Sequence, residues 1–161
     1  DAPKRTQPRP PPRHFAKTNK GKKGEVLYPA HENPELSYQI DLALDDLSEF
    51  AQNLAFFYSS VYQSDEYNQK FTKLITKDLP GLVGKIEARL EKNASKYLLS
   101  EEMTLADIWV AGYLLGFPYD ETEKNCHILQ VPFEKSERVK AYVHTLLEDF
   151  RFWKESFKFA V

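Results

Sequence analysis

Cys126 and His127 are adjacent residues whose side chains could bind a metal ion or form a nucleophile pair. A zinc site needs about four converging ligands, and a thiolate nucleophile needs a base held beside it. The other histidines are His14, His31 and His144, which are scattered through the chain. Adjacent side chains on an extended loop point apart. We therefore expect an ordinary loop thiol at Cys126 and no metal site.

Two pairs of acids, Asp45-Asp46 and Glu101-Glu102, could be taken for general acid–base machinery. Adjacent residues on a helix do not face each other, so the two carboxylates of a pair do not meet at one reacting group. The sequence also has no Ser/His/Asp order, no phosphate-binding loop and no His-Glu-x-x-His motif. The acids are predicted to lie on solvated helix faces, and no residue is predicted to be catalytic.

Thr104 and Asp107 have the spacing of a capping box, with Asp in place of the usual Glu. In that motif the side chain of Thr104 accepts the N–H of Asp107, and the Asp107 carboxylate accepts the N–H of Thr104. Met103 and Ile108 stand at the spacing of a hydrophobic staple. From Ile108 on, the predicted helix 104–117 carries no charge, so it should be the most buried element.

Apolar residues recur at steps of four and three along two long segments, which predicts two amphipathic helices. The first is expected to start near Asn33, with Pro34 at its first position, and carries its apolar face from residue 36 to 61. The second starts near Ser64 and runs to about residue 93. Pro80 falls inside the second and predicts a kink, because proline cannot donate to the carbonyl of Thr76. Asn93 is expected to end this helix.

The remaining elements are expected after the capped helix. They are a loop over 118–133, a helix over 135–148 and a short aromatic helix over 150–159. No alternation of apolar and polar residues is long enough for a strand, and no internal repeat occurs. The predicted fold class is all-α, a bundle of five to six helices with an extended amino-terminal arm.

Residues 1–24 form a basic, proline-rich arm. They hold eight Lys/Arg against one acid, for a formal charge of +7, whereas residues 25–161 carry −9. Two interpretations of the arm are equally favoured, a solvated tail and a segment that docks onto an acidic protein surface. Docking needs only charge and an extended backbone. Nucleic-acid binding ranks third, since Phe15 is the arm's one aromatic residue for base stacking. The basic residues are Lys4, Arg5, Arg9, Arg13, Lys17, Lys20, Lys22 and Lys23.

The composition fits one globular domain over residues 25–161 after the arm, with 42% hydrophobic and 14% aromatic residues in a chain of 161. A single cysteine excludes an internal disulfide, which indicates a reducing, intracellular compartment, the cytoplasm ahead of an organelle. No apolar run reaches the roughly 20 residues needed to cross a bilayer, so no membrane span is predicted. The chain begins with Asp1, which indicates processing or truncation.

Several segments together resemble the carboxyl-terminal helical domain of the glutathione S-transferase family, over roughly residues 25–157. The most specific is the capped segment, where Tyr97-Leu98 precedes a short acidic loop and Thr104-Leu105-Ala106-Asp107-Ile108. The others follow in the family's order: Leu27-Tyr28-Pro29, Asn33-Pro34-Glu35, Tyr38-Gln39-Ile40-Asp41, Leu79-Pro80-Gly81-Leu82, Ile86-Glu87-Ala88-Arg89-Leu90, the stretch from Ser136 to Val143, and Lys154-Glu155. The resemblance implies the family's helical fold.

In that family an amino-terminal thioredoxin-like domain binds glutathione and supplies the activating Tyr, Ser or Cys. Residues 1–24 contain no strand-like run that could belong to such a domain. The favoured function is therefore a non-catalytic interaction or structural module, a subunit of a larger assembly with other proteins as partners. The alternative is the acceptor-site half of a glutathione transferase, with glutathione as a cofactor only if a thioredoxin-like domain is supplied elsewhere.

A group of aromatic residues gives the resemblance a further implication. In transferases of this family, parts of the first long helix and of the capped helix line the site for the hydrophobic co-substrate, so a small apolar pocket is permitted here. Core packing and a protein interface are favoured over it, since both bury large aromatic side chains. We expect the chain to be part of a protein complex, in which the partner orders its arm. The group is Phe56, Phe57, Tyr58, Val61, Tyr62, Tyr113 and Tyr119.

Overall fold

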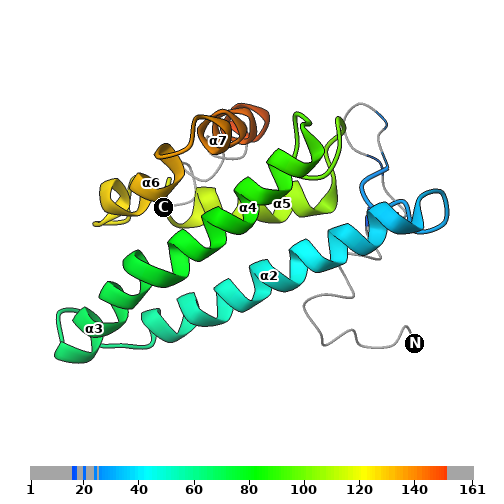
Figure 1. Ribbon diagram of the computed structural model, residues 1–161. Coiled ribbons are helices and arrows are strands. Elements are labelled where there is room, and N and C mark those ends of the chain that lie inside the picture. Colours follow the sequence, from blue (N-terminus) through cyan, green and yellow to red (C-terminus); the bar gives the residue numbers. More distant parts are fainter. Residues whose placement is uncertain (1–15, 18–19, 21–23, 25, 152–161) are drawn as a thin grey trace, which may run out of the picture.

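The computed structural model describes residues 16–17, 20, 24 and 26–151 (Figure 1). This part of the chain contains six α-helices and one π-helical segment, and its β-structure is limited to a bridge between Lys20 and Val26. The fold class is therefore all-α, as the sequence predicted. The predicted helix 150–159 lies outside the described residues from position 152 on. So do the arm residues Lys4, Arg5, Arg9, Arg13, Lys22 and Lys23.

Helix α2 (Pro34–Tyr58) is the long helix at the front of Figure 1. It starts where the sequence predicted, because the Asn33 side chain accepts the N–H of Leu36 at 3.0 Å and a proline occupies its first position. The predicted extension to residue 61 is wrong. The chain leaves the helix at Ser59 and turns through Gln63, whose φ of 63° lies in the left-handed region.

The second predicted helix consists of three consecutive elements: α3 (Asp65–Lys73), the π-helical segment η1 (Leu74–Asp78) and α4 (Leu79–Asn93). The N–H of Leu79 donates to the carbonyl of Leu74, five residues back. This wider turn stands directly before Pro80, which has no N–H for the carbonyl of Thr76. The disturbance predicted at Pro80 therefore takes the form of a π-helical turn, and α4 still ends at Asn93 as expected.

Helix α5 (Leu105–Gly116) is the capped helix, and half of its residues are buried, the largest share among these helices. It packs against α2 on one side and against α7 (Glu137–Asp149) on the other. The helix predicted over 135–148 is confirmed as α7, which begins after Ser136, whose hydroxyl accepts the N–H of Val139 at 3.4 Å.

The predicted loop over 118–133 is wrong beyond residue 125, where α6 (Cys126–Glu134) begins. Leu129 and Phe133 are one turn apart and both are buried, and α6 packs against α4 and α7. Pro132 lies near the end of this short helix, where its missing N–H removes only one hydrogen bond. Tertiary burial of one apolar face thus outweighs the proline signal that favoured a loop.

The helices surround one core, with α2, α4 and α5 in one group and α6 and α7 in another. Figure 1 shows α2 and α4 side by side, with α5 behind them and α6 and α7 on the side of α4 away from α2. The core includes Ala16, which is 1% exposed and lies ahead of the domain start expected at residue 25. The chain therefore contributes to the core before it enters α2.

Asp46 ties α2 to α4, because its carboxylate accepts hydrogen bonds from Lys85 Nζ at 2.8 Å and from the Arg89 guanidinium. Burial raises the pKa of Asp46, but the hydrogen bonds and charges of these two cations outweigh burial and lower it below 3.8. A carboxylate with a lowered pKa stabilises the fold above its unfolded pKa. That contribution is lost as the pH falls through the folded value.

We expect Asp46→Asn to lower the free energy of unfolding by about 1 kcal/mol at about pH 7, and by less and less as the pH falls below about 4. Urea unfolding of both proteins at a series of pH values measures the difference. Glu91→Gln, which removes an exposed carboxylate from α4, is the control and should show no such trend. A cost that stays constant down to about pH 3 would show that Asp46 does not act through its charge.

Candidate functional site

Four large hydrophobic side chains are exposed at the end of α2 and in the turn after it. Phe56 is 60% exposed, Tyr58 53%, Val61 77% and Tyr62 49%. We call these four residues the aromatic patch. Single exposed apolar residues are ordinary, but four large ones within one short stretch of chain are not, and exposed groups of this kind often mark a binding role. The patch is therefore the strongest candidate for a functional surface among the described residues.

Buried and half-buried aromatic rings form the floor of the aromatic patch. The ring of Phe57 is 3% exposed, and its centroid lies 5.1 Å from Tyr58 and 4.9 Å from Tyr67. Tyr67 also contacts Tyr62 at 5.1 Å and stacks on Phe71 at 6.1 Å, nearly parallel to it. Tyr67 and Phe71 were not part of the predicted aromatic group. Their spacing of four residues on the exposed α3 was the available signal.

Two lysines stand over rings of the aromatic patch. Lys70 Nζ lies 3.5 Å from the centroid of the Phe56 ring and donates to the Phe56 carbonyl at 3.0 Å. Lys124 Nζ lies 4.4 Å from the centroid of the Tyr62 ring. Such cation–π contacts hold the rings in place and put positive charge at the edge of an apolar surface. Lys70 also pairs with Glu66 at 2.6 Å, so part of its charge is balanced locally.

Hydrogen bonds join the aromatic patch to the loop before α6. The Tyr58 hydroxyl donates to Glu123 Oε2 at 3.0 Å, and Asn125 Nδ2 donates to the Tyr67 hydroxyl at 3.3 Å. Burial and the neighbouring Glu123 carboxylate raise the pKa of Tyr58 well above 10. A phenol with a raised pKa stays protonated at neutral pH, so Tyr58 acts as a hydrogen-bond donor and not as a base or nucleophile.

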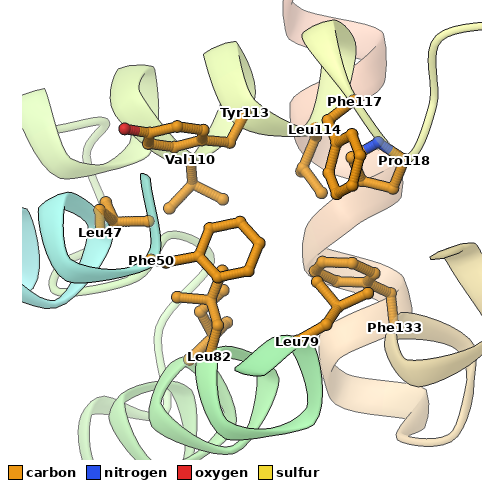
Figure 2. Close-up of a pocket in the computed structure, with 11 residues that line it drawn as sticks. Leu47, Phe50, Leu79, Leu82, Val110, Tyr113, Leu114, Phe117, Pro118 and Phe133 are labelled. Carbon is orange, nitrogen blue, oxygen red and sulfur yellow. The ribbon is translucent and has the colours of Figure 1, made fainter. Parts of the chain in front are cut away.

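Two members of the aromatic group, Tyr113 and Tyr119, pack against rings away from the aromatic patch. Tyr113 packs edge-on against Phe50, with centroids 6.2 Å apart, and Tyr119 packs against Phe133 at the same distance. Figure 2 shows a pocket between α2, α4, α5 and Phe133 that contains only Tyr113 of the seven. Its cavity volume of about 10 Å³ admits no more than one water. Of the seven residues, this pocket therefore involves Tyr113 alone. The lining residues are Leu47, Phe50, Leu79, Leu82, Ile86, Val110, Tyr113, Leu114, Phe117, Pro118 and Phe133.

The Asp107 carboxylate is fully buried and accepts four hydrogen bonds. Oδ2 accepts from the N–H and the hydroxyl of Thr104, both at 2.8 Å. Oδ1 accepts from the N–H of Leu98 and the hydroxyl of Tyr142, both at 2.9 Å. The pair has the reciprocal geometry of a capping box, and the Leu98 and Tyr142 bonds add partners that the sequence analysis missed. Burial raises the pKa of Asp107, against the four hydrogen bonds, which lower it.

The other predicted site residues lie apart from the aromatic patch or at its edge. Met103 and Ile108 are half-buried against the core. Cys126 is half-buried at the start of α6, so Cys126 and His127 belong to a helix and not to the predicted extended loop. Lys17 of the arm places its Nζ 5.4 Å from the ring centroid of Tyr28.

Within residues 16–17, 20, 24 and 26–151, no three or more His, Cys, Asp or Glu side chains gather in a way that could hold a metal ion. None of the helices in this part of the chain combines the length and the apolar character needed to span a bilayer.

The family model of the glutathione S-transferase C-terminal domain matches residues 53–146. The match begins in the last turns of α2 and extends through α3, α4, α5 and α6 into α7, so it includes the aromatic patch and the Asp107 centre. No curated protein and no solved structure matched the chain. The matched residues are more than half of the 161. The chain therefore belongs to the glutathione S-transferase family, through that family's C-terminal domain.

Proposed function

We propose that the chain is a non-catalytic protein-interaction or structural module, and that it works as a subunit of a larger assembly with other proteins as its partners. The observation that carries the proposal is the aromatic patch, whose four large apolar side chains are each about half exposed or more. The centres of protein interfaces are enriched in Tyr and Phe, and such residues contribute most of the binding energy.

The aromatic patch is built as a rigid surface, which supports a binding role. Phe57 and Tyr67 pack beneath it, and the Tyr58–Glu123 hydrogen bond fixes one of its rings. Lys70 holds the ring of Phe56. Side chains that are already fixed lose little conformational entropy when a partner binds, so more of the contact energy appears as affinity.

The proposal assigns no catalytic role to the phenols of the chain. Burial raises the pKa of Tyr113, and burial together with Glu134 raises that of Tyr119 to about 12. These groups remain protonated near neutral pH, which disfavours them as bases. The core cavity of Figure 2 is too small for an organic co-substrate, and a larger pocket of about 230 Å³ beside α2 and α4 is lined mostly by charged and polar side chains.

Substitution of the aromatic patch tests the proposal. In the cells that normally make the protein, the tagged wild-type chain is expected to elute from a sizing column in a complex larger than the chain itself. Phe56→Ser with Tyr62→Ser should shift it toward the monomer, because both side chains leave the proposed interface. Val131→Ser, which removes an equally exposed residue from α6, is the matched control. A patch variant that elutes with the wild type would contradict the proposal.

Calorimetry tests the prediction that the chain by itself does not bind glutathione. We expect the purified chain to release no heat of binding with glutathione at about millimolar concentration, where a binding site of useful affinity would be filled. We also expect no conjugation of an electrophilic acceptor. Saturable heat, or conjugation above the rate without protein, would favour the alternative, in which the chain is the acceptor-site half of a transferase.

A further inference from the structure

The outer face of α2 is a continuous exposed stripe. Its residues follow one another at steps of four and three, which keeps them on one side of a helix, and every one of them is exposed. We call them the outer face: Tyr38, Leu42, Asp45, Glu49, Gln52 and Phe56. The stripe has aromatic residues at both ends and two acids in its middle. Its last residue also belongs to the aromatic patch.

Helix α2 is strongly acidic. Its 25 residues include Glu35, Asp41, Asp45, Asp46 and Glu49, and no Lys or Arg. Lys85 and Arg89 of α4 approach the flank of α2 at Asp46, and Lys85 also lies 3.3 Å from Glu49. The Glu49 side chain remains 69% exposed. The helix therefore offers an acidic, partly aromatic surface to a basic segment.

The first fifteen residues of the chain supply a basic segment. They contain Lys4, Arg5, Arg9 and Arg13 against one acid, together with five prolines. Prolines favour the extended polyproline II conformation, and such segments bind along aromatic surfaces with their basic residues on flanking acids. From the sequence, a solvated tail and docking onto an acidic partner protein were equal interpretations of the arm, but an acidic surface also exists within the chain itself.

The point at which this segment joins the domain lies beside α2. Ala16 is buried in the core, and the ammonium group of Lys17 lies over the ring of Tyr28. The Tyr28 hydroxyl in turn donates to Asp41 Oδ2 at 2.9 Å. Asp41 precedes Leu42 in α2 and borders the outer face. A chain leaving Ala16 thus starts next to the stripe.

The spacing of the arginines along the arm agrees with the spacing of their proposed partners along α2. Asp41 and Glu49 are eight residues apart, or about 12 Å along an α-helix, and Phe56 lies about 10 Å further on. In polyproline II the step from Arg13 to Arg9 is about 12 Å, and the step from Arg9 to Arg5 is the same. We propose that residues 4–13 of the chain dock along the outer face of α2 of the same molecule, with Arg13 near Asp41, Arg9 near Glu49 and Arg5 near Phe56.

Trypsin cleavage of the full chain after Arg13 tests the proposal. At low salt we expect Asp45→Asn with Glu49→Gln to be cut about tenfold faster than the wild type, because the contact between Arg9 and Glu49 and the neighbouring negative charge of Asp45 are lost. About 0.5 M NaCl should remove most of the difference by screening. Glu134→Gln with Glu137→Gln, which neutralises two exposed acids of α6 and α7, is the matched control and should be cut like the wild type.

A charge exchange makes the test specific to one contact. Arg9→Glu and Glu49→Arg should each speed cleavage after Arg13, and the double variant should return to the slow rate. Circular dichroism checks that each variant is folded. Equal cleavage rates in all proteins, or a double variant that stays fast, would overturn the proposal. So would protection that grows with protein concentration between about 1 and 100 μM, since it would assign the outer face to the arm of a second copy.

Discussion

Asp107→Ala is expected to lower the free energy of unfolding by about 3–5 kcal/mol. The change removes an acceptor that is fully buried and satisfies four donors. Each donor left without a partner inside a protein costs about 1–3 kcal/mol, although the Thr104 and Tyr142 hydroxyls can rotate toward other acceptors. The backbone N–H groups of Leu98 and Thr104 cannot.

Urea unfolding followed by circular dichroism measures this cost, and three further variants divide it. Thr104→Ala should cost about 1 kcal/mol, as a lost cap does. Tyr142→Phe should cost about 1–2 kcal/mol, since one donor disappears and the carboxylate keeps three. Asp107→Asn keeps the shape but turns an NH₂ group toward two donors, so it should remain clearly destabilising. An Asp107→Ala protein within 1 kcal/mol of the wild type would refute this account of the centre.

Phe57→Ala should cost about 3–5 kcal/mol, whereas the neighbouring Phe56→Ala should cost less than about 1 kcal/mol. The two residues are adjacent and chemically identical, but the ring of Phe57 is buried under Tyr58, Tyr67 and Phe71. The ring of Phe56 is exposed and contacts the Lys70 ammonium. Truncating a buried ring loses its transfer free energy and leaves a cavity, and truncating an exposed ring loses a cation–π contact.

The pair serves as its own control, because chain length, helix position and residue type are the same. Urea midpoints measure how much stability each variant loses. In the sizing experiment on the assembled protein, we expect the opposite order, with the larger loss of assembly in Phe56→Ala. Phe56→Ala should weaken partner binding while leaving the fold intact, since the exposed ring is the one available to a partner. Equal stability costs for the two variants would mean that the end of α2 is not ordered as described.

Local signals in the sequence were enough to predict several helix boundaries. Asn33-Pro34, Ser64 and the Thr104–Asp107 pair each placed a helix start where it is found, because capping depends on residues within one turn. The four-and-three spacing of apolar residues likewise identified the buried faces of α2 and α4. Helix α6 escaped detection, because Pro132 and the short length hid a periodicity that only packing on α4 and α7 stabilises.

The sequence by itself thus determined the all-α class, the capped central helix and the separation of a basic arm from an acidic body, since each depends on local spacing or on composition. Tertiary structure alone decided which members of the aromatic group are core and which are surface. Phe56 and Phe57 cannot be told apart by residue type, and their difference arises when α3 folds back over one side of α2. The same holds for Asp107, whose partner Tyr142 lies 35 residues away and meets it only because α7 packs on α5. Contacts of this kind depend on the arrangement of whole helices, which no local pattern encodes.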